Sequence, residues 1–243
     1  MSPGKPQPLK PDTMKILLSA LAVLPALVLA QPKHVFVNAQ FHRDFDREAF
    51  TSTIEILQLD RFGSTFFFTD YDFYSTGQTG SYFEVARNHV VLRTKPLVAN
   101  ITVQYNDGVL DVDALWGKQI PRTLLYGIAL SHLMIGPAYF ELQGLVRQEF
   151  GAEAGIQFTG VWSWPIPRTP LTFQGYIDWF QHHYLNQPPV VLAEPQLLFR
   201  QRKWTLGTEL EISRNYSGAY TESDGFELRK WYAHPTIFLR VDF

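Results

Sequence analysis

The chain has 243 residues, of which 46% are hydrophobic and 15% aromatic, and its formal net charge is −2. This balance excludes the basic excess that nucleic-acid binding needs, and the absence of cysteine excludes a small disulfide scaffold. The 19 Phe, 11 Tyr and 6 Trp are more rings than a soluble cytosolic domain needs. Stability must therefore come from packing or from a closed network of backbone hydrogen bonds.

The N-terminal segment has the pattern of a signal peptide. Lys15 opens a positive region, and residues 16–29 form an apolar stretch of about 14 residues that ends at the small residue Ala30. This stretch is too short for a membrane-spanning helix, which needs roughly 20 apolar residues. We therefore predict that residues 1–30 are an N-terminal extension and signal peptide, cleaved near Ala30, and that residues 31–243 are the exported domain.

After the signal peptide, apolar and polar residues alternate with a period of two, as in strands with one apolar and one polar face. The clearest segments are 34–42, 97–106, 153–162, 171–179, 191–200 and 204–212. Weaker segments near 51–60, 63–73, 81–92, 122–131 and 137–147, with the final one at 231–243, bring the number to about twelve. An even number of strands, joined by alternately longer and shorter connections, is typical of bacterial outer-membrane barrels. The sequence therefore predicts an all-β fold, an antiparallel transmembrane β-barrel of about 12 strands.

The last segment resembles the C-terminal strand of such barrels. Counting back by twos from Phe243 gives the apolar residues Val241, Leu239 and Ile237, and the chain ends on this aromatic residue. In outer-membrane barrels the terminal Phe is recognised by the assembly machinery. The resemblance therefore implies an integral protein of the bacterial outer membrane, with outer-membrane lipid around it and the assembly machinery as a partner through Phe243.

A periplasmic β-sandwich is the competing architecture, because it also alternates apolar and polar residues. Its polar face would look into bulk water and should be rich in Lys, Glu, Ser and Thr. Here the polar face carries rings among its charges, as where Phe66 and Phe68 precede Asp70 and Asp72. Such a face suits an enclosed, wet interior, and the apolar face has rings near both ends of its strands, as interfacial girdles do. Both observations favour the barrel.

Three neighbouring stretches resemble a known family. These are Thr53-Ile54-Glu55-Ile56, Gly63 through Phe73, and Ser81-Tyr82-Phe83-Glu84-Val85, which together form an acidic and aromatic hairpin followed by a strand with Glu between hydrophobic residues. They look like the nucleoside-specific channel-forming outer-membrane porins (Tsx-like), of which this chain would be a divergent member with shorter loops. The resemblance implies a monomeric twelve-stranded barrel with a narrow, aromatic-lined interior that passes nucleosides.

The polar face also supplies candidates for solute contact. A sugar-bearing base needs stacking surfaces, worth about 1–3 kcal/mol per base, and polar groups that orient its hydroxyls and ring edges. The predicted substrate-lining residues are Phe66, Phe68, Asp70, Asp72, Tyr82, Glu84, Glu141, Tyr176, Asp178, Glu194, Arg200 and Glu209. The alternative for each is structural, because paired charges in a narrow barrel commonly fill and rigidify its interior.

The sign of the interior follows from the same assignment of faces. The acids placed inward are Glu55, Asp70, Asp72, Glu84, Glu141, Glu153, Asp178, Glu194, Glu209 and Glu211. The bases placed inward are Arg147, Arg200, Lys230 and Arg240. A narrow passage with this excess of acids should favour cations and neutral solutes over anions.

Two further functions compete with a channel. Some outer-membrane barrels are lipid-modifying enzymes of the lipase or deacylase type, with a nucleophilic Ser beside a His at the lipid-facing rim. Ser131-His132 falls at an inward turn, which is the wrong place, and the adjacent His182 and His183 would point to opposite sides of an extended loop. The third possibility is a plugged barrel that serves adhesion or a structural role. We predict no catalytic residue, no metal and no cofactor, and a passive channel for a small polar solute.

Overall fold

The computed structural model describes residues 33–74, 77, 79–94, 97–111, 118–181, 188–216 and 229–243. The strands are β1 (His34–Asp44), β2 (Ala49–Asp60), β3 (Gly63–Tyr74), β4 (Thr79–Arg93), β5 (Val98–Asp111), β6 (Lys118–Ile135), β7 (Ala138–Glu149), β8 (Ala154–Pro165), β9 (Leu171–Phe180), β10 (Val190–Ala193), β11 (Gln196–Gln201), β12 (Trp204–Arg214) and β13 (Trp231–Asp242). In the part of the chain so described, no helix is long and apolar enough to cross a membrane.

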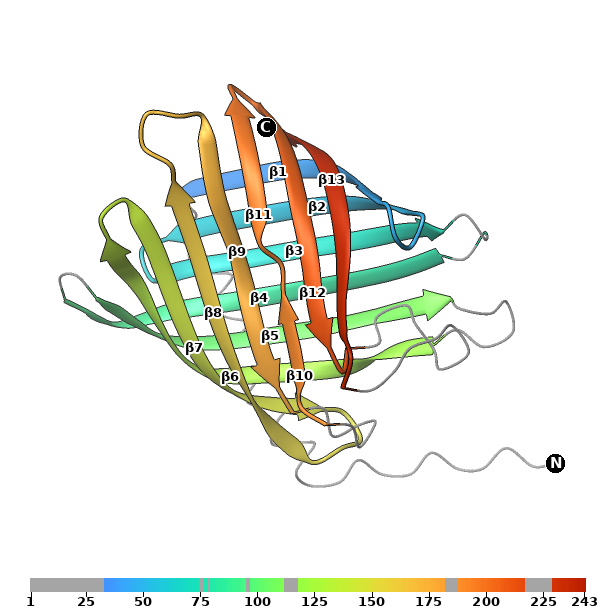
Figure 1. Cartoon of the computed structure of the whole chain (residues 1–243). Helices are drawn as coiled ribbons and strands as arrows, with labels where there is room; N and C mark the ends of the chain where they lie inside the picture. Colours follow the sequence, from blue (N-terminus) through green and yellow to red (C-terminus); the bar gives the residue numbers. More distant parts are fainter. Residues whose placement is uncertain are drawn as a thin grey trace.

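The strands close into a barrel. Each pairs antiparallel with its neighbours, and β13 pairs with β12 on one side and with β1 on the other, through Leu206↔Leu239 and Ala39↔Val241. Closure leaves no edge strand among the described residues. Every strand can therefore exchange backbone hydrogen bonds on both sides, as a lipid environment requires. Figure 1 shows the strands of the near wall running steeply across those of the far wall, as the tilt of a closed barrel produces.

Strands β10 and β11 together occupy one strand position of the barrel. Both pair with β12 in the same register, through Ala193↔Ile212 and Gln196↔Glu209, and both pair with β9. The interruption falls at Pro195, which has no N–H to donate to the ladder. The thirteen segments therefore fill twelve strand positions, and the predicted twelve-stranded antiparallel barrel is confirmed.

The two ends of the barrel differ in their connections. Short connections at 61–62, 94–97, 136–137, 166–170 and 202–203 join the strands at one end, here called the turn end. The other end, the loop end, carries 45–48, 75–78, 112–117, 150–153, 181–189 and 215–230. In Figure 1 the turn end lies toward the upper left and the loop end toward the lower right. Strand β1 starts and β13 finishes at the turn end, as the alternation of connection lengths predicted.

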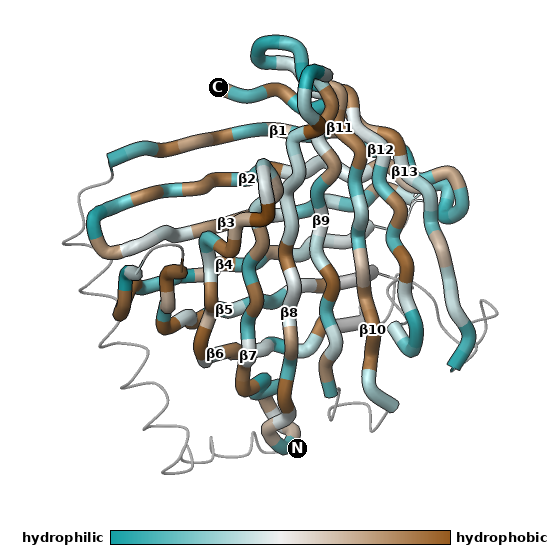
Figure 2. Tube along the Cα trace, turned by 60° about the vertical axis from the view of Figure 1, so that its left-hand side comes forward, coloured by the Kyte–Doolittle hydropathy of each residue, from teal (hydrophilic) through white to brown (hydrophobic). Residues whose placement is uncertain are grey.

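The outer face of the barrel is apolar. Ile128, Leu142 and Leu206 are 60%, 54% and 50% exposed, which would be costly in water over a whole surface but suits contact with lipid. The alternation appears along the strands in Figure 2, where hydrophobic and hydrophilic positions follow one another. Exposed tryptophans mark both ends, with Trp204 at the turn end and Trp231 at the loop end, as in interfacial aromatic girdles.

Candidate functional site in the barrel interior

The side chains that alternate with the lipid-facing ones point into the barrel. On β1, for example, Asn38, Gln40, His42 and Asp44 are buried although they are polar, while Phe41 between them is 54% exposed. A buried polar face opposite an exposed apolar one is the reverse of a soluble protein. The interior is therefore the place where polar chemistry gathers, and it is the candidate site.

The register places all twelve predicted substrate-lining residues in this inward set. They are Phe66, Phe68, Asp70 and Asp72 on β3, Tyr82 and Glu84 on β4, Glu141 on β7, Tyr176 and Asp178 on β9, Glu194 between β10 and β11, Arg200 on β11, and Glu209 on β12. Contact of these side chains with a solute remains a prediction.

Three rings form a continuous aromatic track on the wall made by β3 and β4. The ring centroids of Phe66 and Phe68 are 5.8 Å apart, and those of Phe68 and Tyr82 are 5.5 Å apart. The Tyr82 hydroxyl donates to Glu84 Oε2 at 3.2 Å. The track thus offers flat apolar surface with a carboxylate at its border, which is the combination that a ring-bearing polar solute needs.

The carboxylates beside this track are held by neutral donors. Thr53 Oγ1 donates to Asp70 Oδ1 and Thr51 Oγ1 donates to Asp72 Oδ1, both at 2.6 Å. Because β2 and β3 are adjacent, each hydroxyl fixes the carboxylate opposite it without cancelling its charge. Each threonine hydroxyl therefore sets the orientation of one carboxylate on the inner wall.

A second polar group lies on β7, β8 and β9. Arg147 donates to Glu149 Oε1 at 3.0 Å and to Gln157 Oε1 at 2.9 Å, and its guanidinium lies 4.1 Å from the centroid of the Phe180 ring. Glu84 of β4 interacts electrostatically with Arg147 and with Asp178 of β9. Strands β4, β7 and β9 are not neighbours in the sheet. The interior is therefore narrow enough for charges on facing walls to interact.

A chain of amides and carboxylates continues along β9, β11 and β12. Arg200 donates to Gln174 Oε1 at 3.2 Å, Gln174 donates to Gln196 Oε1 at 3.0 Å, and Gln196 donates to Glu209 Oε2 at 2.5 Å. Glu209 in turn interacts electrostatically with Asp70 of β3. This chain connects the acids of β12 to the acidic wall formed by β2 and β3.

The sequence analysis missed the interior residues Arg47 and Tyr216 because they lie outside the strands, and its inward acids also left out Asp44, Glu149 and Asp242. Arg47, in the loop between β1 and β2, donates from Nε to Asp44 Oδ2 at 2.6 Å and pairs with Glu211 Oε2 at 3.0 Å. Burial alone would lower the pKa of Arg47, but the two carboxylates outweigh it and raise that pKa, so Arg47 stays a cation. Tyr216 follows β12, and burial together with Glu211 raises its pKa, so it stays a neutral phenol.

Two of the charges predicted to be inward lie outside the strands. Glu153 precedes the first residue of β8 and is exposed, and Lys230 precedes β13, is exposed, and has its ammonium 5.5 Å from the centroid of the Tyr232 ring. The period-two pattern had been extended one residue past the ends of these strands, where it no longer fixes a face. Whether Glu153 and Lys230 face the passage therefore stays a prediction.

Carboxylates still outnumber guanidinium groups on the inner wall. The inward acids are Asp44, Glu55, Asp70, Asp72, Glu84, Glu141, Glu149, Asp178, Glu194, Glu209, Glu211 and Asp242. The inward arginines are Arg147, Arg200 and Arg240, with Arg47 reaching in from its loop. Arg240 pairs with Asp242 at 2.6 Å and lies 3.8 Å from Glu55. Pairing therefore neutralises only part of the acidic wall.

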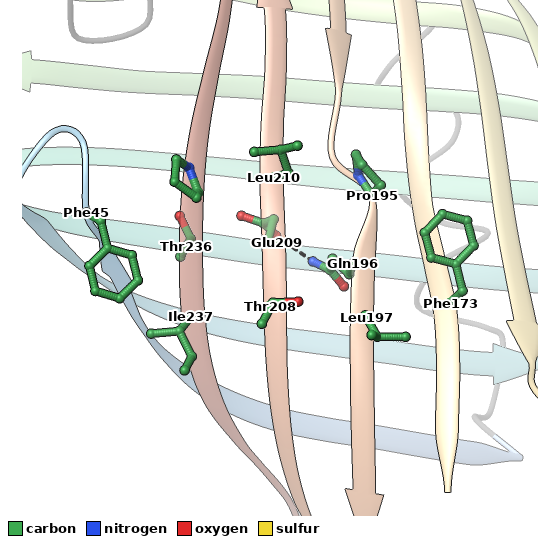
Figure 3. A pocket seen from close by; sticks show the side chains of 11 residues that line it. Phe45, Phe173, Pro195, Gln196, Leu197, Thr208, Glu209, Leu210, Thr236 and Ile237 are labelled. Carbon is green, nitrogen blue, oxygen red and sulfur yellow. Dashed lines mark hydrogen bonds between the residues drawn. The ribbon is translucent and has the colours of Figure 1, made fainter. Parts of the chain in front are cut away.

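A groove of about 460 Å³ lies against strands β9, β11, β12 and β13 (Figure 3). Its outward-facing lining is apolar and includes Phe173, Leu197, Leu210 and Ile237, with Phe45 of the β1–β2 loop beside them. The groove borders the point at which Pro195 separates β10 from β11. Its lining also includes the inward Gln196, Glu209 and Thr236, so the groove borders the polar interior on that side.

Among the described residues, no group of three or more His, Cys, Asp or Glu side chains is arranged to hold a metal ion. The polar interior is thus a set of carboxylates, amides and rings, whose available chemistry is electrostatic attraction, hydrogen bonding and stacking.

Solved structures similar to this fold include two porins. A KdgM porin matches with a TM-score of 0.55 and 7% identity, over 86% of this chain and 99% of that one. A NanC porin matches with a TM-score of 0.55 and 9% identity, over 85% of this chain and 98% of that one. Among curated proteins, none matches this sequence. At these identities the likeness establishes the fold alone.

The closed barrel, its apolar outer face and its polar interior define a transmembrane β-barrel with the porin fold. A family model covers residues 31–243, so the chain belongs to the family described as Domain of unknown function (DUF5020). The similar structures include KdgM and NanC porins, and the nucleoside specificity implied by the resemblance to Tsx-like channels stays a prediction.

Proposed function

We propose that this protein is an integral outer-membrane channel that passes small polar solutes, neutral or cationic, by passive diffusion. The observation that carries the proposal is the excess of inward carboxylates beside the aromatic track of Phe66, Phe68 and Tyr82. In a narrow passage with low-dielectric walls, fixed charges of one sign raise the local concentration of counter-ions and exclude ions of the same sign. Neutral solutes avoid this penalty and can stack on the rings.

Nucleosides are the solute class that this chemistry fits best. A nucleoside is neutral, its base offers a flat face for the aromatic track, and its sugar hydroxyls can donate to carboxylates such as Asp70 and Glu84. Nucleotides and free phosphate should be disfavoured by the acids. One structure of the KdgM porin is described as a complex with disordered oligogalacturonate. That ligand is a polyanion, which the acidic wall here would repel.

A lipid-modifying enzyme is the alternative. Ser131 Oγ lies 3.2 Å from His132 Nδ1, so the two are within hydrogen-bonding reach. Ser131 is 5% exposed, however, and its hydroxyl also accepts from Asn100 Nδ2 at 3.0 Å inside the turn end of the barrel. An enzyme of this type needs its nucleophile at the lipid-facing surface, so the placement supports a channel. His182 and His183, the other candidates, lie outside the described residues.

Wild-type protein reconstituted in planar bilayers tests the proposal. We expect ohmic steps and, across a salt gradient, a reversal potential that reports cations as the more permeant ions. Added nucleosides should reduce the current by occupying the interior, whereas galacturonate oligomers at equal concentration should have less effect. A protein that folds but does not conduct, and that hydrolyses phospholipid or lipid A, would support the enzyme instead.

Export and assembly are part of the same proposal. Residues 1–30, the predicted signal peptide, lie outside the described residues. Phe243 is 81% exposed at the turn end, and its backbone N–H donates to the Val37 carbonyl at 3.0 Å. A ring that packs on little of its own barrel is available to an assembly partner at the periplasmic side.

Deleting Phe243 should therefore slow assembly far more than it lowers the stability of the finished barrel. We expect reduced outer-membrane levels of the heat-modifiable, folded form and an accumulation of unfolded chain in the periplasm. Phe243→Tyr is the matched control, because it keeps an aromatic terminus and should assemble normally. Normal outer-membrane levels after the deletion would remove the assembly role from this residue.

A further inference from the structure

We propose that Arg47 sets the charge selectivity of the barrel at its loop end, as the fixed cation that limits the preference of the acidic mouth for cations. This inference rests on the proposed channel function. The new element is a specificity-determining role for one loop residue, which lies outside the strands and therefore outside any period-two pattern.

The loop that carries Arg47 is fixed in place by contacts on both sides. Asp44 Oδ1 accepts from the backbone N–H groups of Asp46 at 2.9 Å and Arg47 at 2.8 Å. Asp46 Oδ2 lies 2.7 Å from His234 Nδ1 of β13, and the Phe45 N–H donates to the Pro235 carbonyl at 3.2 Å. These hydrogen bonds hold the loop against β13 and fix the direction of the Arg47 side chain.

The Arg47 side chain passes β13 and reaches into the mouth. Its Nε lies 2.6 Å from Asp44 of β1, and its terminal nitrogen lies 3.0 Å from Glu211 of β12. It also interacts electrostatically with Asp72 of β3 and with Tyr216. These partners come from three separate parts of the barrel wall, and the side chain is only 20% exposed. Arg47 thus occupies the interior, where a permeating ion must pass it.

The local charge balance gives this residue its effect. In the described part of the mouth, Arg47 interacts with three carboxyl groups, those of Asp44, Asp72 and Glu211, and its positive charge offsets part of their negative charge. A guanidinium does not lose its proton at any accessible pH, so the positive charge of Arg47 is permanent. Removing it would leave three uncompensated carboxylates at the mouth, which would raise the local cation concentration.

The test compares reversal potentials of single channels across a salt gradient of KCl. For Arg47→Gln we expect the permeability ratio of K⁺ to Cl⁻ to rise about twofold to fivefold over wild type. Arg47→Lys keeps the charge and should stay close to wild type. Glu211→Gln removes a partner and leaves the guanidinium less compensated, so the ratio should fall. Heat-modifiable mobility on gels checks that each variant is folded.

Arg122→Gln is the matched control. Arg122 also lies toward the loop end, but it is 56% exposed on the outer face, where it pairs with Asp107 at 3.2 Å. The same loss of one positive charge should there leave the ratio unchanged. An equal shift in Arg47→Gln and Arg122→Gln, or no shift in either on a conducting protein, would overturn the role of Arg47 alone. A folded wild-type protein that does not conduct would instead overturn the channel itself, and Arg47 with it.

Discussion

Placing an arginine on the outer face of the barrel should destabilise it by about 2–4 kcal/mol, whereas the same change one residue later should cost far less. Leu142 lies near the middle of β7 and is 54% exposed, so Leu142→Arg would bury a charge in the hydrocarbon layer. Equilibrium unfolding in urea, followed by tryptophan fluorescence in phospholipid vesicles, measures the free energy difference from wild type.

Gln143→Arg is the control, because Gln143 points inward. Its amide donates to Glu141 Oε1 and accepts from Gln104 Nε2, both at 2.7 Å. An arginine at this position meets an existing carboxylate, so the expected cost is about 0–1 kcal/mol. Equal losses for the two neighbouring variants would mean that the faces are wrongly assigned. The comparison therefore tests the membrane orientation of the wall without reference to function.

The faces of the strands were predictable because successive side chains of a strand point to opposite faces. In a closed barrel one of these faces is the inside and the other is the outside. On β3 the residues Phe66, Phe68, Asp70 and Asp72 share one side, and the alternation alone was enough to place them in the interior. The same rule does not extend to Glu153 and Lys230, which lie just beyond strand ends, so their inward orientation stays a prediction. Alternation holds only while the backbone is extended and paired on both sides.

Other features depended on closure and could not be obtained from a linear pattern. Arg47 meets Glu211 only because β12, β13 and β1 become neighbours when the barrel closes. The break at Pro195 was hidden for the opposite reason, since the registers on its two sides are continuous and the alternation passes through it unchanged. Its missing N–H, and not its place in the pattern, separates β10 from β11.

The specificity of the interior was the least predictable feature. The early acidic and aromatic hairpin resembles that of Tsx-like channels, whereas the solved structures that match include KdgM and NanC porins. Barrels of one architecture share their outer face and hydrogen-bond network, whereas inward side chains are free to vary without loss of the fold. Selectivity must therefore be argued from the charges of this interior, such as Asp70 and Glu209.

Neutralising these two acids should lower the preference for cations more than any change at the rim. Asp70 on β3 and Glu209 on β12 interact across the interior, and their hydrogen bonds come from the neutral donors Thr53 and Gln196. In the double variant Asp70→Asn and Glu209→Gln, the same donors can bind an amide oxygen, so the packing is preserved while two negative charges are lost. We expect the permeability ratio of K⁺ to Cl⁻ to fall about threefold or more.

The control carries the same change in charge at the loop end. Glu48 and Glu153 are both exposed in short connections outside the strands, and Glu48→Gln with Glu153→Gln should shift the ratio only slightly, because water and salt screen exposed charges. Raising the salt concentration should shrink the small effect of the rim pair further and leave most of the effect of the interior pair. If both pairs shift the ratio equally, the interior acids act as scaffold, and the selectivity arises at the surface of the mouth.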